Sequence, residues 1–117
     1  MKVLLNYKRA FFAIGLVALL SSLSFGCKKS SSSSPGPNEV WMQNMAFNPL
    51  SLTVPVGTTI TWSNKDGYAH TVTSDSTLFD SGNVNGSGTF TYQFTKAGTF
   101  AYHCNIHANM HANIIVH

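Results

Sequence analysis

The chain has 117 residues and a mass of 12.7 kDa, which allows one domain and excludes two. Its formal charge of +3 comes from the N-terminal segment. From Asn38 onward the chain has two lysines and four Asp or Glu residues, for a formal charge of −2. This balance excludes a nucleic-acid-binding module, and a charged fraction of 9% excludes a long polar helix or a coiled coil.

Residues 1–26 have the three-part order of a secretory signal peptide. A basic stretch that ends at Arg9 precedes an apolar run over residues 10–20, and small residues follow. As a helix, these eleven residues span about 16 Å, roughly half of a bilayer core, so a permanent membrane span is disfavoured. We predict that residues 1–26 direct export. The alternative is a short buried helix, for which the rest of the sequence offers no helical partners.

Residues 23–27 resemble a bacterial lipobox, in which the cysteine becomes the first mature residue and carries lipid. Cys27 is followed by a segment with five consecutive serines and two prolines, which cannot bury a core. We therefore predict that residues 27–38 form a lipidated, flexible tether on the periplasmic or cell-surface side of a bacterial membrane. The alternative is a soluble secreted protein with a spare thiol.

After the tether, short runs rich in β-branched and aromatic residues alternate with turn residues. Residues 59–63 and 89–94 alternate with a period of two, as half-buried strands do. This pattern predicts an all-β fold, a small antiparallel Greek-key β-sandwich of seven to eight strands. The expected strands are residues 40–47, 50–54, 58–63, 70–74, 88–95, 99–103 and 112–117. The expected core comprises Val40, Leu52, Val54, Ile60, Trp62, Val72, Phe90, Phe94, Phe100, Tyr102 and Ile115.

Four side chains in the C-terminal half of the sequence can ligate a metal ion. Cys104, His107 and Met110 follow one another at intervals of three residues, and His70 lies 34 residues before the cysteine. Two imidazoles, one thiolate and one weak thioether are the ligands of a blue-copper electron-transfer centre. Zinc also binds Cys and His, but usually recruits further Cys, His or carboxylate ligands. The alternative without a metal is that Cys104 and Met110 only fill the core.

Residues 39–117 resemble the cupredoxin family, particularly its amicyanin-like and plastocyanin-like members. The resemblance rests on the short ligand loop, in which Cys104, His107 and Met110 stand three residues apart, and on segments in the family's order. These segments are residues 47–49, 56–57, 61–64, 70–72, 79–82, 97–100 and 102–110. The resemblance implies one copper ion (Cu+/Cu2+) held by imidazole nitrogens of His70 and His107, the Cys104 thiolate and, weakly, an axial Met110.

The resemblance also implies a function. The family carries single electrons and does no bond chemistry, so an enzyme is not expected. Copper oxidases and nitrite reductases pair such a centre with a second catalytic metal. The expected partners are redox proteins such as a cytochrome or a copper oxidase, with no nucleic acid, and the protein is expected to be a monomer.

Three positions depart from the family's usual pattern. Ile106 stands where proline is common, and its N–H is expected to add a donor near the sulfur and raise the potential. Thr71 stands where an asparagine often ties the two ligand loops, and is expected to tie them less firmly. His111 follows the axial position and is expected at the surface, with competition for the axial site as the alternative. Strand alternation turns His103 away from the metal.

Two other functions stay open at this stage. A copper-binding protein for sequestration or delivery would need further thioether or imidazole groups, and Met42, Met45 and His111 offer a small set. Met42 and Met45 are expected to serve in packing, with Met45 near the metal end. The other alternative is a metal-free adhesive β-sandwich.

Overall fold

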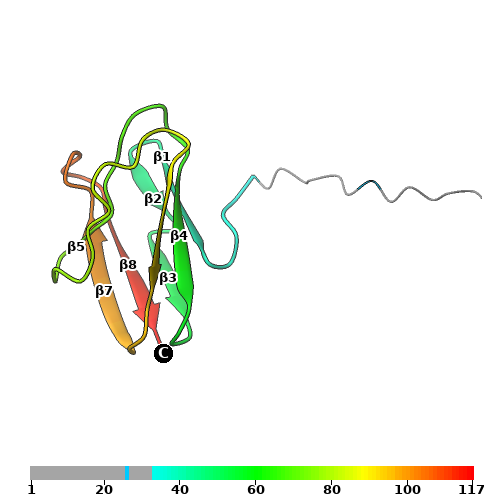
Figure 1. The fold of residues 1–117 in the computed structure, drawn as a ribbon, viewed down its shortest axis with the longest axis vertical. Coiled ribbons are helices and arrows are strands. Elements are labelled where there is room, and N and C mark those ends of the chain that lie inside the picture. The colour runs from blue at the N-terminus through cyan, green and yellow to red at the C-terminus, as the bar shows by residue number, and fades with distance from the viewer. Residues whose placement is uncertain (1–25, 27–32) are drawn as a thin grey trace, which may run out of the picture.

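The computed structural model describes Gly26 and residues 33–117. In this part of the chain, eight strands form two four-stranded sheets and no helix occurs (Figure 1), which confirms the predicted all-β sandwich. The strands are β1 (Glu39–Gln43), β2 (Ala46–Asn48), β3 (Ser51–Val54), β4 (Thr59–Asn64), β5 (Thr73–Ser74), β6 (Thr89–Gln93), β7 (Gly98–His103) and β8 (His111–Val116).

The predicted signal peptide and the predicted lipid-bearing Cys27 lie outside the described residues, except for Gly26. Within the residues that are described, nothing forms a helix of the length and apolar character that a membrane span requires. The end of the predicted tether is described from Ser33 onward, and it leads directly into β1.

The strand order is β2-β1-β4-β6 in one sheet and β3-β8-β7-β5 in the other. Most neighbours are antiparallel, but β1 pairs with β4 and β3 pairs with β8 in parallel. These two pairs depart from the predicted antiparallel arrangement, while the predicted sandwich fold is confirmed. A parallel pair requires the chain to cross over before it returns, and here the chain passes through β2 and β3 between β1 and β4. Repetitive strand and turn signals do not reveal such a crossover.

The core fills the space between the two sheets around Trp62 on β4. Trp62 is fully buried and meets Tyr102 edge to face, with ring centroids 5.5 Å apart. Such aromatic pairs stabilise a core beyond the area that they bury. Seven predicted core residues are confirmed as buried, namely Val40, Val54, Ile60, Trp62, Val72, Phe94 and Tyr102. Leu52, Phe90 and Phe100 are partly buried and pack against this cluster.

Ile115 was predicted in the core, and this prediction is wrong, because its side chain is 36% exposed. Side chains alternate between the two faces of a strand, and in β8 the inward positions are Ile114 and Val116. Two adjacent isoleucines do not show which of them faces inward. The pairing of Ile114 with Leu52 and Phe100 on the neighbouring strands fixes that choice.

The expected strand over residues 40–47 is broken by a tight turn. Asn44 and Met45 both have left-handed backbone conformations, with φ of 55° and 57°. Two consecutive residues of this kind are typical of a two-residue hairpin turn, and the turn reverses the chain from β1 into β2. The turn matters for the site because its backbone N–H groups donate hydrogen bonds to the side chain of Asp66, which lies after β4.

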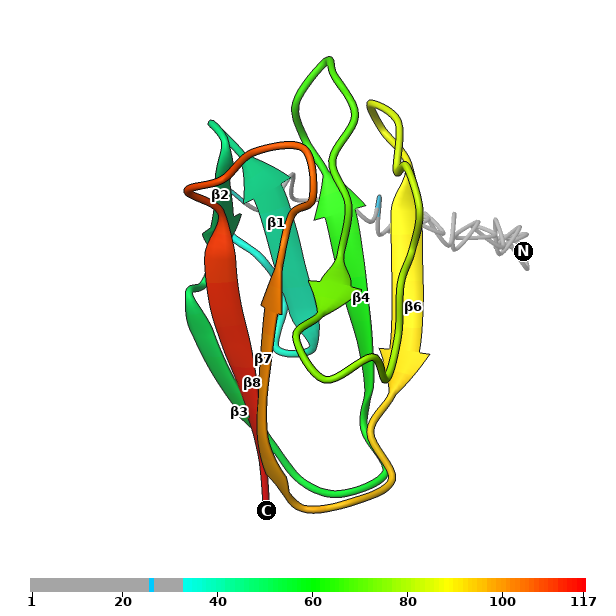
Figure 2. The same ribbon diagram turned by 90° about the vertical axis from the view of Figure 1, so that its left-hand side faces the viewer.

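The expected strand over residues 70–74 is shorter than predicted. Only β5 is a strand, while His70 forms an isolated bridge with Val84. His70 therefore lies on a long connection between β4 and β5. Figure 2 shows that this connection and the β7–β8 loop lie at the same end of the sandwich, opposite the C terminus. The fold thus brings both predicted ligand-bearing segments to one end.

Candidate metal centre

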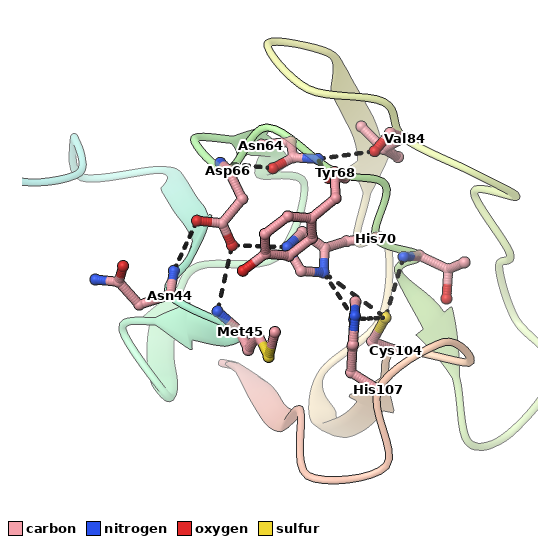
Figure 3. Close-up of polar contacts among 10 residues, drawn as sticks. Asn44, Met45, Asn64, Asp66, Tyr68, His70, Val84, Cys104 and His107 are labelled. Atoms are coloured by element: carbon pink, nitrogen blue, oxygen red, sulfur yellow. Dashed lines mark hydrogen bonds and ion pairs between the residues drawn. The ribbon is translucent and has the colours of Figure 1, made fainter.

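Three of the four predicted ligands converge at this end of the sandwich (Figure 3). The Nδ1 atoms of His70 and His107 are 3.1 Å apart. The sulfur of Cys104 lies 3.6 Å from Nδ1 of His107 and 4.0 Å from Nδ1 of His70. These donor atoms come from two segments more than thirty residues apart, and they form a compact triangle that could hold one ion.

The triangle has the size that a first-row metal ion requires. Bonds of about 2.0 Å to nitrogen and about 2.3 Å to sulfur, at tetrahedral to trigonal angles, place neighbouring donors roughly 3.3 to 3.7 Å apart. The observed separations of 3.1 to 4.0 Å bracket this range. Two imidazoles and one thiolate also match the equatorial donors of a blue-copper site. The residues present therefore fit a copper ion.

The β7–β8 loop carries Cys104, His107 and Met110 and is closed by its own backbone. The N–H of Cys104 donates to the carbonyl of Met110 at 3.0 Å, and the N–H of Met110 donates to the carbonyl of His107 at 3.1 Å. These two bonds bring the first and last residues of the loop side by side. Cys104 and Met110 are both buried, whereas His107 is only partly buried.

The His70 ring is completely buried, and its two nitrogens have different neighbours. Nδ1 faces the sulfur and the other imidazole, while Nε2 lies 2.8 Å from Oδ2 of Asp66. An ionised carboxylate only accepts hydrogen bonds, so Nε2 carries the proton and donates it. In the neutral imidazole this leaves Nδ1 as the unprotonated nitrogen, which is the one able to ligate a metal.

Asp66 was missed by sequence reasoning, which treated it only as part of a turn. Its carboxylate also accepts hydrogen bonds from the backbone N–H groups of Asn44 at 2.9 Å and Met45 at 3.2 Å. Burial by itself would raise the pKa of Asp66, but the hydrogen bonds from Asn44, His70 and Met45 hold that pKa below its usual value. The available signal was its position four residues before His70.

Asn64 orders the start of the connection that carries His70. It is buried, and its side-chain oxygen accepts a hydrogen bond from the N–H of Asp66 at 2.9 Å. Its side-chain nitrogen donates to the carbonyls of Tyr68 at 2.8 Å and Val84 at 2.9 Å (Figure 3). The connection is therefore held by these side-chain hydrogen bonds together with the backbone bridge between His70 and Val84.

Thr71 joins the two ligand-bearing segments. Its N–H donates to the sulfur of Cys104 at 3.3 Å, and its hydroxyl oxygen accepts from the N–H of Asn105 at 2.8 Å. The hydroxyl of Thr71 thus ties the two loops together. In the described part of the chain, the N–H that reaches the sulfur is that of Thr71. The contribution expected of Ile106 stays a prediction.

The surface around His107 is weakly polar. Ile106 is 47% exposed, and Ala108 and Asn109 are also exposed. Tyr68, which sequence reasoning did not single out, is 43% exposed and meets both imidazoles edge on, with ring centroids 5.2 Å from His70 and 5.8 Å from His107. Tyr68 therefore packs against both imidazole rings.

The other histidines of this region have partners of their own. His103 contacts the carboxylate of Asp75 through Nδ1 and the side chain of Asn105 through Nε2. The Asp75 contact raises the pKa of His103 above its usual value. His111 is exposed, as predicted, and its Nε2 donates to the carbonyl of Ala108 at 2.8 Å.

The sequence is similar to a known family of proteins and to individual relatives. The sequence profile described as "Cupredoxin-like domain" matches residues 15–116. The chain is 32% identical over 74 residues to plastocyanin from Scenedesmus fuscus, an alignment that covers 54% of this chain and 76% of the relative. It is 30% identical over 77 residues to amicyanin from Paracoccus denitrificans, covering 62% of this chain and 59% of the relative.

Among solved structures, the novel purple cupredoxin from Nitrosopumilus maritimus is similar to this fold. The TM-score is 0.63 at 27% sequence identity, and the match covers 68% of this chain and 98% of the other. The similarity therefore spans nearly the whole of that protein.

Proposed function

Because the chain belongs to the cupredoxin-like domain family, we propose that it binds one copper ion and carries single electrons. The observation that carries this proposal is the convergence of two imidazoles and one thiol from distant segments, with donor atoms 3.1 to 4.0 Å apart. The likeness to plastocyanin and amicyanin supports the same function.

The proposed ligands are those predicted from the sequence. His70 and His107 bind through Nδ1, because these are the nitrogens that face each other and the sulfur. Cys104 binds as a thiolate, and Met110 is the weak axial ligand. Support for Met110 comes from its burial and from the backbone hydrogen bond that holds it beside Cys104.

Bound copper supplies a one-electron change between Cu(I) and Cu(II). The protein's part is to keep the donors in one arrangement for both states, so that little rearranges when the electron arrives. Full burial of His70 excludes water from its side of the site. The N–H of Thr71 stabilises negative charge on the sulfur. These fixed contacts suit fast transfer more than bond chemistry.

Electrons enter and leave through His107 in this proposal, because it is the partly exposed imidazole. The surrounding Ile106, Ala108 and Asn109 carry no charge and are exposed. A small, weakly polar contact suits brief docking and quick release. Redox proteins such as a cytochrome or a copper oxidase are the proposed partners.

We also propose that the protein is exported and held by lipid on Cys27, with residues 27–38 as the tether. Support comes from the order of the basic stretch, the apolar run, the cysteine and the Ser/Pro-rich segment. Cys27→Ser should move the protein from the membrane to the soluble fraction of the cell envelope. Unchanged fractionation would contradict the lipid anchor and leave the copper proposal intact.

Copper sequestration or delivery is less well supported by the geometry. Met42 is fully buried in the core, and the cluster of possible metal donors found among the described residues comprises His70, Cys104 and His107 without His111. Met45 is exposed on the β1–β2 turn. Reversible oxidation and reduction against a cytochrome would favour the electron carrier over the copper-handling protein.

The test of the function is the visible spectrum of the oxidised, copper-loaded protein. An intense charge-transfer band from thiolate to copper is expected, and Cys104→Ser should abolish it. Cys27→Ser is the matched control, because it removes the other cysteine and should leave the band unchanged. Absence of the band in the wild type, or its survival in Cys104→Ser, would overturn the proposal.

A further inference from the structure

We propose that Asp66 is a positioning residue for the metal ligand His70, and that its carboxylate joins this ligand to the β1–β2 turn. The inference rests on the proposed copper site. It goes further by assigning a role to a residue that is not a ligand and that lies on the side of His70 away from the other donors (Figure 3).

The first support is the number of donors that share this one carboxylate. Oδ2 accepts from Nε2 of His70 at 2.8 Å and from the N–H of Met45 at 3.2 Å, and Oδ1 accepts from the N–H of Asn44 at 2.9 Å. Asp66 is itself fixed by Asn64, which accepts from its N–H. The carboxylate therefore has little freedom to move.

The second support is the choice of nitrogen at His70. A buried imidazole that carried its proton on Nδ1 would present N–H, not a lone pair, to the metal. The carboxylate at Nε2 keeps the proton on that side, which leaves Nδ1 free and directed at Cys104 and His107. It also opposes rotation of the ring, since a turned ring would leave a partly buried carboxylate without its imidazole partner.

The third support is electrostatic. A carboxylate makes a charge-assisted hydrogen bond, which is stronger than one to a neutral carbonyl. An anionic acceptor also raises the basicity of the ligating nitrogen. A more basic imidazole favours Cu(II) over Cu(I), so Asp66 is expected to lower the reduction potential. The turn residues Asn44 and Met45 stabilise this carboxylate in place.

The experiment compares Asp66→Asn with Asp75→Asn in the full chain. Both substitutions remove one negative charge and one carboxylate–histidine contact, but the histidine beside Asp75 is His103, which is not a proposed ligand. Cu(II) affinity should fall about 10- to 100-fold in Asp66→Asn. Cu(I) affinity should fall less, and each tenfold difference raises the potential by about 59 mV. Asp75→Asn should change either affinity by less than about threefold, since the metal's own ligands keep their partners.

A second measurement does not depend on copper. In the metal-free wild type, nuclear magnetic resonance should detect a slowly exchanging proton on Nε2 of His70, and Asp66→Asn should make that proton exchange rapidly or shift it partly to Nδ1. The unfolding midpoint of each variant shows whether the fold survives. If Asp66→Asn does not fold, the site of the ring proton in the wild type still decides.

Two results would overturn the proposal. One is a ring proton on Nδ1 of His70 in the metal-free wild type. The other is a potential that shifts no more in Asp66→Asn than in Asp75→Asn. A wild type without the charge-transfer band would instead refute the copper function, while the ring proton would still report whether Asp66 holds His70.

Discussion

The two segments that carry the proposed ligands are built in different ways. The connection from β4 to β5 places His70 at full burial and holds it through the side chains of Asn64 and Asp66. The β7–β8 loop is short, is closed by two backbone hydrogen bonds, and leaves His107 partly exposed. One segment fixes its proposed ligand from inside the protein, and the other brings its proposed ligand to the surface.

This difference suits the proposed function as an electron carrier. A ligand that is anchored on its inner side keeps the site from rearranging when the charge of the metal changes. A ligand at the surface gives a partner protein a short path to the metal. If the comparison holds, damage to the first segment should affect stability and metal binding together, whereas damage to the second should affect mainly the site.

The largest expected effect is a difference between glycine variants of His70 and His107 in their response to added imidazole. In His107→Gly the gap opens to solvent, so added imidazole should enter it and restore the charge-transfer band. In His70→Gly the gap is buried and Asp66 loses its imidazole partner. Added imidazole should not restore the band there, and the metal-free protein should lose about 2 kcal/mol or more of stability.

Titration of each copper-loaded glycine variant with imidazole, followed by its visible spectrum, checks this expectation. Denaturant unfolding of the metal-free proteins gives the difference in stability. Equal recovery of the band in both variants would remove the contrast between a buried and a surface ligand.

The next effect compares two asparagines, one in each segment. Asn64→Ala removes the side-chain donor to the carbonyls of Tyr68 and Val84, of which Val84 keeps the N–H of His70, and the acceptor of the Asp66 N–H, which should cost about 1–3 kcal/mol of unfolding free energy. Asn105→Ala removes an exposed side chain that contacts Thr73 and His103, and should cost about 0.5 kcal/mol or less. Urea unfolding of the metal-free proteins measures both. A larger loss in Asn105→Ala would reverse the assignment of the two segments.

A smaller effect tests the tie between the segments. Thr71→Val keeps the N–H that donates to the sulfur but removes the hydroxyl that accepts from the N–H of Asn105. The loss should be about 1 kcal/mol in stability, with faster amide exchange at Asn105. Thr71→Ser retains the hydroxyl and is the control. A Thr71→Val variant as stable as the wild type would contradict this tie, because valine keeps the methyl group and lacks only the hydroxyl.

The smallest effect concerns Ile106. Because Thr71 already donates a hydrogen bond to the sulfur, a proline at position 106 should lower the midpoint potential only slightly, by less than Asp66→Asn raises it. Voltammetry of Ile106→Pro against the wild type measures the shift. An unchanged or higher potential would show that the N–H of Ile106 does not act on the sulfur.

Several features of this protein followed from the sequence. The period-two runs and turn residues predicted the β-sandwich, and the types and spacing of Cys104, His107 and Met110 predicted one metal-binding loop. His103 and His111 were assigned away from the metal, and each has polar partners of its own. These are local properties, because strand alternation and loop spacing depend on residues close together in the chain.

Tertiary structure decided the rest. The inward face of β8 depends on both neighbouring strands, so Ile114 and not Ile115 is buried. The partners of Asp66 include backbone N–H groups 21 and 22 residues away, which no local pattern connects to it. The distance between His70 and Cys104 likewise depends on how the sheets cross. Sequence supplied the donor atoms, and the packing of the sheets set which of them meet and which nitrogen each imidazole presents.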